Sequence, residues 1–461
     1  MTERIQNEVA PRHGMRLVAA PSNDLKGTAV VPGDKSISHR ALIFGALSIG
    51  KTEITGLSRG EDVIATAEAL IDLGVQIDGL DDYVRGACNT VSVYGQGVSG
   101  LKEPTRPLDL GNSGTGVRLL MGVAGQHDFP SIFTGDESLS GRPMGRVAKP
   151  LRAMGISVEG REGDLLPMRV VGPPDLMPIV YEMPVASAQV KSAILLAALA
   201  APGITEIIEP SPSRDHSERM ARYFGADVKT SLGDDGRPHI LVRGEIELQA
   251  ADINVPTDPS AAAFPIVAAL ISNAGSVCVP NVCVNKTRTG LFEVLQSMGG
   301  DIRFEDERDQ GGEAVADIFA TSSHLEGVDV PTEVAPRMID EYPILAVAAA
   351  FASGRTHMPG IAELRVKESD RIAKMVEGLT LSGVKAVAGD DFMTVEGARG
   401  GVAGGVTIDS ALDHRIAMSF AVLGLGSQAP IELTGAAAVR SSFPGFAALM
   451  RTLGADITER E

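Results

Sequence analysis

The stretch SAQVKSAILLAAL (Ser187–Leu199) starts with small polar residues and becomes almost wholly apolar after its first turn. Similar stretches are SISHRALIFGAL (Ser36–Leu47), SAAAFPIVAALI (Ser260–Ile271) and DHRIAMSFAVLGL (Asp413–Leu425). With weaker copies at Ser113 and Asp340, six such starts lie about 75 residues apart in a chain of 461 residues. A helix that is apolar on all sides is buried, so the pattern predicts six repeats with one buried helix each.

A second pattern lies between these helix starts. Apolar residues lead to a glycine that is soon followed by a β-branched residue, as in LRAMGISVE and MRTLGADIT. A glycine just past the last turn ends a helix in a left-handed conformation, and the β-branched residues favour a strand. These glycines are Gly74, Gly155, Gly225, Gly299, Gly383 and Gly454. Each repeat is therefore predicted to contain two helices and several short strands.

The repeats also predict the domain division. PTDPS (Pro256–Ser260) lies between the third and fourth repeats and is interpreted as a crossover, with a second crossover at Val31-Pro32-Gly33. We expect residues 33–255 to form one domain and residues 1–32 to join residues 256–461 in the other. The chain length agrees with more than one domain. Residues 1–12 are expected to be a flexible tail, and their mixed charges do not resemble a secretory signal.

Composition disfavours several classes of protein. The formal net charge is −18, which disfavours nucleic acid and anionic membranes as partners. The apolar runs are well short of the roughly 20 residues that a membrane-spanning helix needs. Three cysteines without paired spacing fit a reducing compartment better than a disulfide framework. We therefore expect a cytoplasmic protein that binds neither nucleic acid nor membrane, and we also expect a monomer.

Polar residues at the predicted helix starts indicate an anion site. Helix N-termini carry partial positive charge, so a lysine or arginine there costs stability unless an anion binds. GDKSISHR (33–40) places Lys35, Ser36 and Arg40 at such a start. LGNSGTGVR (110–118) adds glycines that let the backbone approach a phosphate closely. A solvated turn and an ordinary capped helix are the alternative explanations.

Three further features offer charge and proton transfer. GDESLSGRPMGR (135–146) carries Arg142, whose forked donors suit carboxylate and phosphate. RVKESDR (365–371) places Lys367 and Arg371 around Glu368, which could move a proton, although a solvated charge cluster is the usual explanation of such a run. Asp340 precedes an apolar helix, where an N-cap and a general base are both compatible with the sequence.

In combination these motifs resemble the 5-enolpyruvylshikimate-3-phosphate synthase family. PGDKSISHR, LGNSGTGVR, SLSGRPMGR, ASAQVKSA, RVKESDR and DHRIAMSF occur in the family's order and spacing, from about Leu25 to the C-terminus. The motif sequences GDKSISHR, RPMGR and SAQVKSA are similar to those of the bacterial second class of the family. The resemblance implies an α/β fold of two similar domains, each an inside-out α/β barrel of three βαβαββ units, with ligands in the cleft between the domains.

The resemblance also implies a reaction and its residues. The enolpyruvyl group of phosphoenolpyruvate would pass to the 5-hydroxyl of shikimate 3-phosphate without a cofactor or a metal. Asp340 would take the hydroxyl proton, and Glu368, perhaps with Lys35, would protonate the methylene carbon. Shikimate 3-phosphate would contact Lys35, Ser36, Arg40, Ser187, Ala188, Gln189, Arg214, Asp340 and Lys367. Phosphoenolpyruvate would contact Lys35, Gly114, Arg142, Gln189, Arg371 and Arg415.

Two positions depart from family patterns. SSFPGF (441–446) lacks the lysine that some members place before the Phe-Pro pair. Gly114 stands where glyphosate-tolerant members of the second class can carry alanine, so we expect glyphosate to inhibit this protein.

Three alternatives compete with this interpretation. Many UDP-N-acetylglucosamine enolpyruvyltransferases carry a cysteine on the mobile loop over the donor, but no cysteine lies near Arg142. An ATP-dependent phosphotransferase would use GALSIGKT (45–52) as a P-loop, yet this segment is predicted to close a helix and open a strand, the reverse of a P-loop. A non-catalytic repeat scaffold would leave the clustered cations unexplained.

Overall fold

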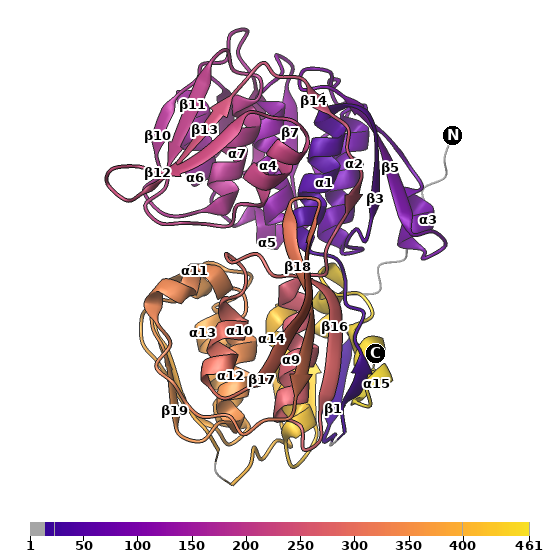
Figure 1. Cartoon of the computed structure of the whole chain (residues 1–461), viewed down its shortest axis with the longest axis vertical. Helices are drawn as coiled ribbons and strands as arrows, with labels where there is room; N and C mark the ends of the chain where they lie inside the picture. Colours follow the sequence, from indigo (N-terminus) through magenta and orange to yellow (C-terminus); the bar gives the residue numbers. More distant parts are fainter. Residues whose placement is uncertain (1–13, 23, 399, 461) are drawn as a thin grey trace. The chain divides into compact units, whose positions relative to one another are not determined.

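The computed structural model describes residues 14–22, 24–398 and 400–460, so the tail expected at residues 1–12 lies outside the described part. The chain divides into two compact units. Unit 1 comprises Met1–Val31, Thr257–Glu307 and Ala316–Glu461, and unit 2 comprises Pro32–Pro256 and Arg308–Val315 (Figure 1). Two unit boundaries lie at the crossovers that the sequence indicates.

One segment departs from the expected division. Residues 256–461 were predicted to lie in one domain, but Arg308–Val315 belongs to unit 2. This segment is the end of a hairpin formed by β17 (Asp301–Gln310) and β18 (Glu313–Thr321). Its Glu313 is buried and its Oε1 lies 2.7 Å from Nδ1 of His216. The prediction was wrong here because the local sequence indicates which two strands of a hairpin pair. It does not indicate the remote segment against which the end of the hairpin packs.

Unit 2 is built around the first three predicted buried helices. These are α1 (Lys35–Leu47), α4 (Gly114–Ala124) and α7 (Ala188–Ala198). The other helices are α2 (Glu61–Asp72), α3 (Leu80–Val84), α5 (Glu137–Ser140), α6 (Gly145–Ala153) and α8 (His216–Tyr223). The strands are β3 (Ser48–Thr55), β4 (Gln76–Asp78), β5 (Thr90–Gln96), β6 (Leu108–Asp109), β7 (Ser131–Thr134), β8 (Ser157–Arg161), β9 (Leu165–Val171), β10 (Val180–Glu182), β11 (Ile204–Ile208), β12 (Val228–Leu232), β13 (Pro238–Arg243), β14 (Leu248–Gln249) and β15 (Ile253–Asn254).

The described strands of unit 2 form three sheets with one shared topology. Their orders are β14-β3-β5-β4, with β15 also on β3, then β6-β7-β9-β8 and β10-β11-β13-β12. In each, the first pair is parallel and the next two pairs are antiparallel. The third sheet follows the chain order β-α-β-α-β-β that the resemblance implied, and the second follows it with two helices, α5 and α6, in the second helical position.

Unit 1 repeats this plan with α9 (Pro259–Ile271), α12 (Tyr342–Phe351) and α14 (His414–Gly426) as its buried helices. The other helices are α10 (Gly290–Ser297), η1 (Thr332–Val334), α11 (Ala335–Met338), η2 (Ala362–Val366), α13 (Arg371–Leu381), η3 (Ala436–Ser441) and α15 (Phe446–Thr452). The remaining strands are β1 (Arg16–Ala20), β2 (Lys26–Thr28), β16 (Ser276–Cys283), β19 (Arg355–Met358), β20 (Lys385–Ala388), β21 (Met393–Glu396), β22 (Thr407–Asp409), β23 (Ile431–Thr434) and β24 (Asp456–Arg460).

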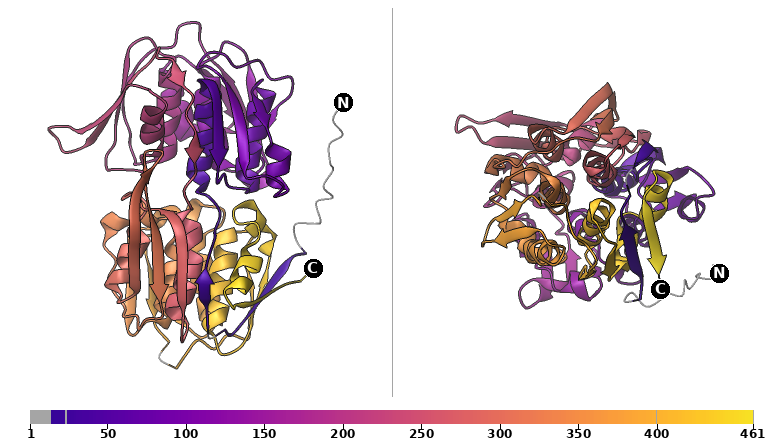
Figure 2. Two further views of the ribbon diagram at one scale, coloured as in Figure 1. Left: turned by 45° about the vertical axis from the view of Figure 1, so that its right-hand side comes forward. Right: turned by 90° about the horizontal axis from the view of Figure 1, so that it is seen from below.

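The sheets of unit 1 combine both ends of the described chain. Their orders are β22-β23-β1-β24, β17-β18-β16-β2 and β19-β21-β20. Strand β1 lies between β23 and β24 and pairs antiparallel with both, so the first and last described strands are neighbours (Figure 2). The short strand β2 pairs parallel with β16 in the second sheet.

Helices rather than a closed barrel of strands form the core of unit 1. Helices α9, α12 and α14 contact one another, and nearly every residue in them is buried. Figure 1 shows β16, β17 and β18 lying over the outside of these helices. The six predicted glycines that follow helix ends all have positive φ, between +84° and +101°. The repeat pattern in the sequence is therefore confirmed as six helix-centred α/β repeats with separate mixed sheets.

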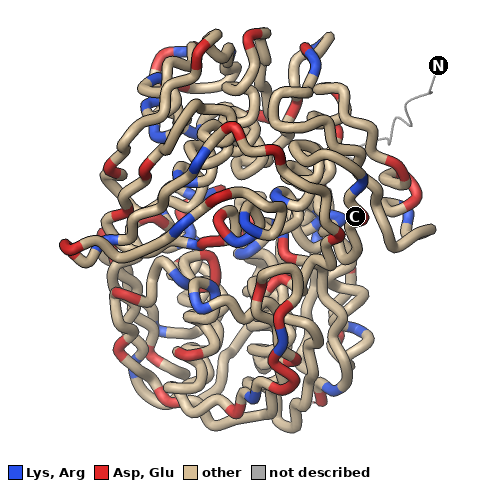
Figure 3. The backbone as a smooth tube through the Cα atoms, turned by 45° about the horizontal axis from the view of Figure 1, so that its top comes forward, with Lys and Arg blue, Asp and Glu red and all other residues tan. Residues whose placement is uncertain are grey.

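Within the described residues, no helix is long and apolar enough to cross a membrane. Nor does the described part of the chain bring three or more His, Cys, Asp or Glu together as a metal site would. GALSIGKT spans the end of α1 and the start of β3, as predicted, so it lacks the strand-to-helix context of a P-loop. Figure 3 shows Lys and Arg interspersed with Asp and Glu along the chain.

Candidate active site

In unit 2 the predicted site residues begin the three buried helices. Asp34, Ser113 and Ser187 are the N-caps of α1, α4 and α7, and each side chain accepts a hydrogen bond from a backbone N–H of its helix. Lys35 and Ser36 occupy the first turn of α1, Gly114 starts α4, and Ala188 and Gln189 start α7. Because helix N-termini attract anions, their grouping in one unit favours anionic ligands.

Arg40 is a buried guanidinium whose hydrogen bonds go to neutral groups. Its Nε donates to Ser217 Oγ at 2.7 Å, Nη2 to Ser192 Oγ at 2.7 Å, and Nη1 to the Ser36 carbonyl at 2.9 Å. Burial lowers the pKa of Arg40 to about 10, although Glu218 and Asp34 oppose this. A buried cation whose hydrogen-bond acceptors are neutral would be stabilised by a bound anion.

His39 is a buried histidine on α1 that follows Lys35 and precedes Arg40. Burial is the largest cause that lowers its pKa to about 3, and the charges of Lys35 and Arg40 lower it further. The imidazole Nδ1 lies 2.8 Å from Thr66 Oγ1. Asp34 opposes this shift, and His39 is therefore neutral near pH 7 mainly because it is buried.

Lys35 has a carboxylate partner that sequence reasoning missed. Its Nζ lies 2.9 Å from Asp62 Oδ2, and both side chains are largely buried. Asp62 lies in the first turn of α2, where an acidic residue is expected for helix capping alone. The acidic residue was visible in the sequence, but nothing local indicated a partner 27 residues away.

Gln189, in the first turn of α7, forms hydrogen bonds with two residues in the first part of α4. Its Nε2 donates to Thr115 Oγ1 at 2.9 Å, and its Oε1 accepts from Arg118 Nη1 at 2.9 Å. Arg118 is the last residue of the motif LGNSGTGVR, but the sequence did not indicate it as a site residue. Arg142 donates from Nη2 to Asn112 Oδ1 at 2.6 Å, so it also lies at the start of α4.

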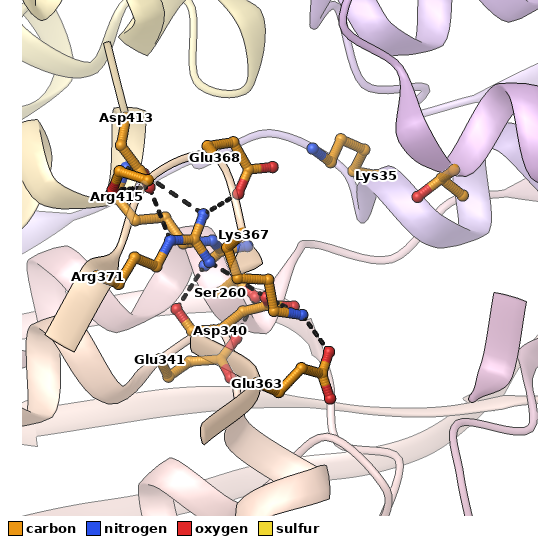
Figure 4. Close-up of polar contacts among 12 residues, drawn as sticks. Lys35, Ser260, Asp340, Glu341, Glu363, Lys367, Glu368, Arg371, Asp413 and Arg415 are labelled. Atoms are coloured by element: carbon orange, nitrogen blue, oxygen red, sulfur yellow. Dashed lines mark hydrogen bonds and ion pairs between the residues drawn. The ribbon is translucent and has the colours of Figure 1, made fainter. Parts of the chain in front are cut away.

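Arg371 organises the predicted residues of unit 1. Its side chain is 1% exposed, with Nε 2.8 Å from Asp413 Oδ2, Nη2 2.6 Å from Glu368 Oε2 and Nη1 3.4 Å from Asp340 Oδ1 (Figure 4). Burial alone would lower the pKa of Arg371, but Asp413, Glu368 and Asp340 outweigh it and raise the pKa. This geometry overturns the solvated-cluster explanation of RVKESDR.

Asp340 is not the N-cap of α12, since that position belongs to Glu341. Its carboxylate lies 3.8 Å from Lys367 Nζ as well as near Arg371, and its carbonyl accepts from Arg415 Nη1 at 3.1 Å. Lys367 also pairs with Glu363, which sequence reasoning missed. The Asp340 carboxylate thus faces two cations, Lys367 and Arg371.

Asp413, noted in the sequence only as a helix start, completes this network. It is fully buried, caps α14 through the Arg415 N–H at 2.9 Å and accepts from Arg371. Burial would raise the pKa of Asp413, but Arg371 outweighs this, and the pKa is lowered. Arg371 therefore has three carboxylate partners in unit 1, of which the sequence indicated Asp340 and Glu368 as site residues but not Asp413.

The structure thus collects the predicted residues in two groups. In unit 1 it joins Asp340, Lys367, Glu368, Arg371 and Arg415 in one network of hydrogen bonds and ion pairs. In unit 2 it places Lys35, Ser36, Arg40, Gly114, Ser187, Ala188 and Gln189 at three helix starts. Arg142 lies beside Gly114, and Arg214 lies between β11 and α8, one residue from Asp215, the N-cap of α8.

Six helix-centred α/β repeats in two units, with cations at the helix starts, define a class of two-domain α/β proteins that bind small anions. Residues 19–450 match the family model of EPSP synthase, 3-phosphoshikimate 1-carboxyvinyltransferase. The 3-phosphoshikimate 1-carboxyvinyltransferase of Parvibaculum lavamentivorans is 53% identical over 444 residues, which cover 96% of this chain and 97% of the relative. The chain belongs to the EPSP synthase family.

Solved structures agree with this assignment. EPSP synthase from Acinetobacter baumannii superposes with a TM-score of 0.86 at 44% identity, covering 97% of this chain and 100% of that one. The enolpyruvyl transferase NikO from Streptomyces tendae superposes with a TM-score of 0.76 over 97% of this chain and 99% of that one. At 17% identity, the second likeness concerns the fold alone.

Proposed function

We propose that this protein transfers the enolpyruvyl group of phosphoenolpyruvate to the 5-hydroxyl of shikimate 3-phosphate and releases phosphate, a step of aromatic amino acid biosynthesis. The family model and the relatives at about 50% identity over nearly their full length support this reaction. The observation that carries it in this chain is Arg40, a buried guanidinium in α1 whose hydrogen-bond acceptors are neutral.

The two groups of residues act on the same pair of substrates. Shikimate 3-phosphate is held by Lys35, Ser36, Arg40, Ser187, Ala188, Gln189, Arg214, Asp340 and Lys367. Phosphoenolpyruvate is held by Lys35, Gly114, Arg142, Gln189, Arg371 and Arg415. Both substrates carry a phosphate and a carboxylate, so their approach costs electrostatic energy unless cations offset it. Lysine and arginine supply that charge, and arginine adds paired hydrogen bonds to each oxyanion.

The chemistry divides between two carboxyl groups. Glu368, assisted by Lys35, delivers one proton to the methylene carbon of phosphoenolpyruvate, which makes the adjoining carbon electrophilic. The 5-hydroxyl oxygen attacks that carbon while Asp340 removes its proton, and a tetrahedral adduct forms. Loss of a methyl proton and of phosphate then restores the double bond in the product. No electrons leave or enter the substrates, so one acid and one base suffice.

A phosphate-release assay tests the reaction directly. Phosphate should appear only when phosphoenolpyruvate and shikimate 3-phosphate are both present, and the rate should persist after a chelator removes divalent metals. Replacement of shikimate 3-phosphate by UDP-N-acetylglucosamine is the matched control and should give no phosphate. Release with the nucleotide sugar, or a requirement for ATP and magnesium, would contradict the proposal.

Gly114→Ala should weaken phosphoenolpyruvate binding. A Cβ there would lie 3.0 Å from Arg118 Nη1 and 3.2 Å from Arg142 Nη1, so both guanidinium groups must shift. We expect KM for phosphoenolpyruvate to rise about tenfold, because a small displacement of a binding group is costly. Gly141→Ala, beside Arg142, is the control, because its φ of −87° suits alanine and the nearest atom to the added Cβ lies 3.6 Å away.

The same variant tests the response to glyphosate. We propose that micromolar glyphosate inhibits the wild-type protein, because Gly114 leaves space beside Arg142. Inhibition should weaken in Gly114→Ala in parallel with the rise in KM. A wild-type protein that keeps full activity in micromolar glyphosate would contradict this.

We also propose that the protein belongs to the second bacterial class of the family and acts as a cytoplasmic monomer. The motif sequences GDKSISHR, RPMGR and SAQVKSA support the assignment to the second class. The reduced cysteines and the acidic composition support the location. Sedimentation at micromolar concentration should give one species with the mass of a single chain.

A further inference from the structure

A buried polar network lies directly behind Asp340. Glu341, the next residue, is 3% exposed, and its Oε1 accepts a hydrogen bond from Ser260 Oγ (Figure 4). Ser260 Oγ also accepts from Arg288 Nη2 at 3.0 Å, and the same nitrogen lies 3.2 Å from Asp258 Oδ1. Ser260 and Arg288 are 4% and 3% exposed and the Asp258 side chain is 14% exposed, so most of these contacts are shielded from water.

Helix capping does not explain Glu341. It occupies the N-cap of α12, a position where a side chain normally accepts from its own helix, yet it makes no such hydrogen bond. Its side chain points instead to Ser260 in the first turn of α9, which Asp258 caps through the Ser260 N–H at 2.8 Å. Its second oxygen, Oε2, is buried and has no hydrogen-bond partner. A carboxyl group kept in this setting costs stability, so a role other than capping is indicated.

The contacts on either side of this turn show what Glu341 fixes. The Glu341 N–H donates to the Met338 carbonyl at 2.9 Å, which closes the turn between α11 and α12. Asp340 stands within that turn, with its carboxylate facing Arg371 and Lys367. Neighbouring residues of a tight turn cannot reorient independently, so an anchor on Glu341 limits the directions available to Asp340.

We infer that Glu341, held by Ser260 and Arg288, is a positioning residue that orients the Asp340 carboxylate toward the 5-hydroxyl of shikimate 3-phosphate. This inference rests on the proposed role of Asp340 as the base. A base must lie within hydrogen-bond reach of the proton it takes, and misplacement by about 1 Å can cost a large factor in rate. Glu341 itself touches no substrate and transfers no proton.

The test is a mutant cycle between Ser260→Ala and Asp340→Asn. Ser260→Ala removes the anchor and should lower kcat about tenfold or more, with KM for phosphoenolpyruvate within twofold of wild type. In the Asp340→Asn background, the same change should alter the residual kcat by less than twofold, because no base remains to be oriented. Thermal unfolding shows whether each variant is folded. Calorimetric titration of shikimate 3-phosphate gives the fraction of its sites that can bind.

Two further variants refine the comparison. Glu341→Gln keeps an acceptor for Ser260 and should retain kcat within about threefold, whereas Glu341→Leu should match Ser260→Ala. Ser272→Ala removes another buried hydroxyl at the far end of α9, bonded to the Ala269 carbonyl at 3.0 Å, and should leave kcat unchanged. If Ser260→Ala does not fold, Glu341→Leu takes its place in the cycle.

The outcomes separate the two assignments. A wild-type kcat in both Ser260→Ala and Glu341→Leu overturns the positioning role, and so does an equal loss in the Asp340→Asn background. A normal kcat in Asp340→Asn itself overturns the base assignment instead.

Discussion

Asp340→Asn should lower kcat by about 10²–10⁴ while shikimate 3-phosphate still binds. Asparagine preserves the size of the side chain and an acceptor for Arg371 Nη1, which lies 3.4 Å from Asp340 Oδ1 in the wild type. It cannot take a proton from the 5-hydroxyl. Arg40 and the starts of α1 and α7 lie in unit 2 and are unaffected by the change. Steady-state phosphate release gives kcat, and calorimetric titration gives the dissociation constant.

The control for this variant is Asp329→Asn, the same chemical change in an exposed ion pair with Arg355 of the same unit. Its kcat should equal that of wild type. Glu368→Gln should also lose turnover, because it removes the proposed proton donor. Near-normal turnover in both Asp340→Asn and Glu368→Gln would overturn the acid–base assignment.

Arg371→Leu should lower the free energy of unfolding by about 3–5 kcal/mol, because it leaves the fully buried Asp413 without its cation. Urea unfolding at pH 7 measures this loss. Arg355→Leu breaks a pair whose side chains are 57% and 68% exposed, and should cost about 0–1 kcal/mol. An equal loss in both variants would contradict the view that the Arg371 network is a buried structural element.

The loss in Arg371→Leu should also depend on pH. In wild type the pKa of Asp413 is lowered, so its contribution is present above the unfolded value of about 3.9 and disappears only as pH falls through the folded value. Without Arg371, burial raises the pKa of Asp413, and protonation in mild acid relieves the buried charge. The difference between the two proteins should therefore shrink from pH 7 toward pH 4, and a constant difference would contradict this explanation.

The sequence predicts the repeated helices and their ends because both depend on local chemistry. Small polar residues cap helices, glycines end them, and apolar runs are buried wherever they occur. The motif residues Lys35, Arg40 and Arg371 also lie at helix starts, where their types are informative on their own.

The counter-charges could not be predicted in the same way. Asp62 and Asp413 are 27 and 42 residues from Lys35 and Arg371, so folding alone brings each carboxylate to its cation. Nothing in the sequence singled out Glu341, and only the packing of α12 against α9 reveals its contact with Ser260. Long-range partners of charged residues are decided by tertiary packing, which local propensity does not encode.

Arg308–Val315 is synthesised after the rest of unit 2, which affects when unit 2 can finish folding. Most of unit 2 is synthesised by Pro256, but its last piece follows only after Thr257–Glu307 of unit 1. Until then the buried ring of His216 lacks Glu313, so a nascent chain halted at Pro256 should be more open to proteases than the full-length protein. Anyone who expresses unit 2 alone must graft this hairpin end onto it.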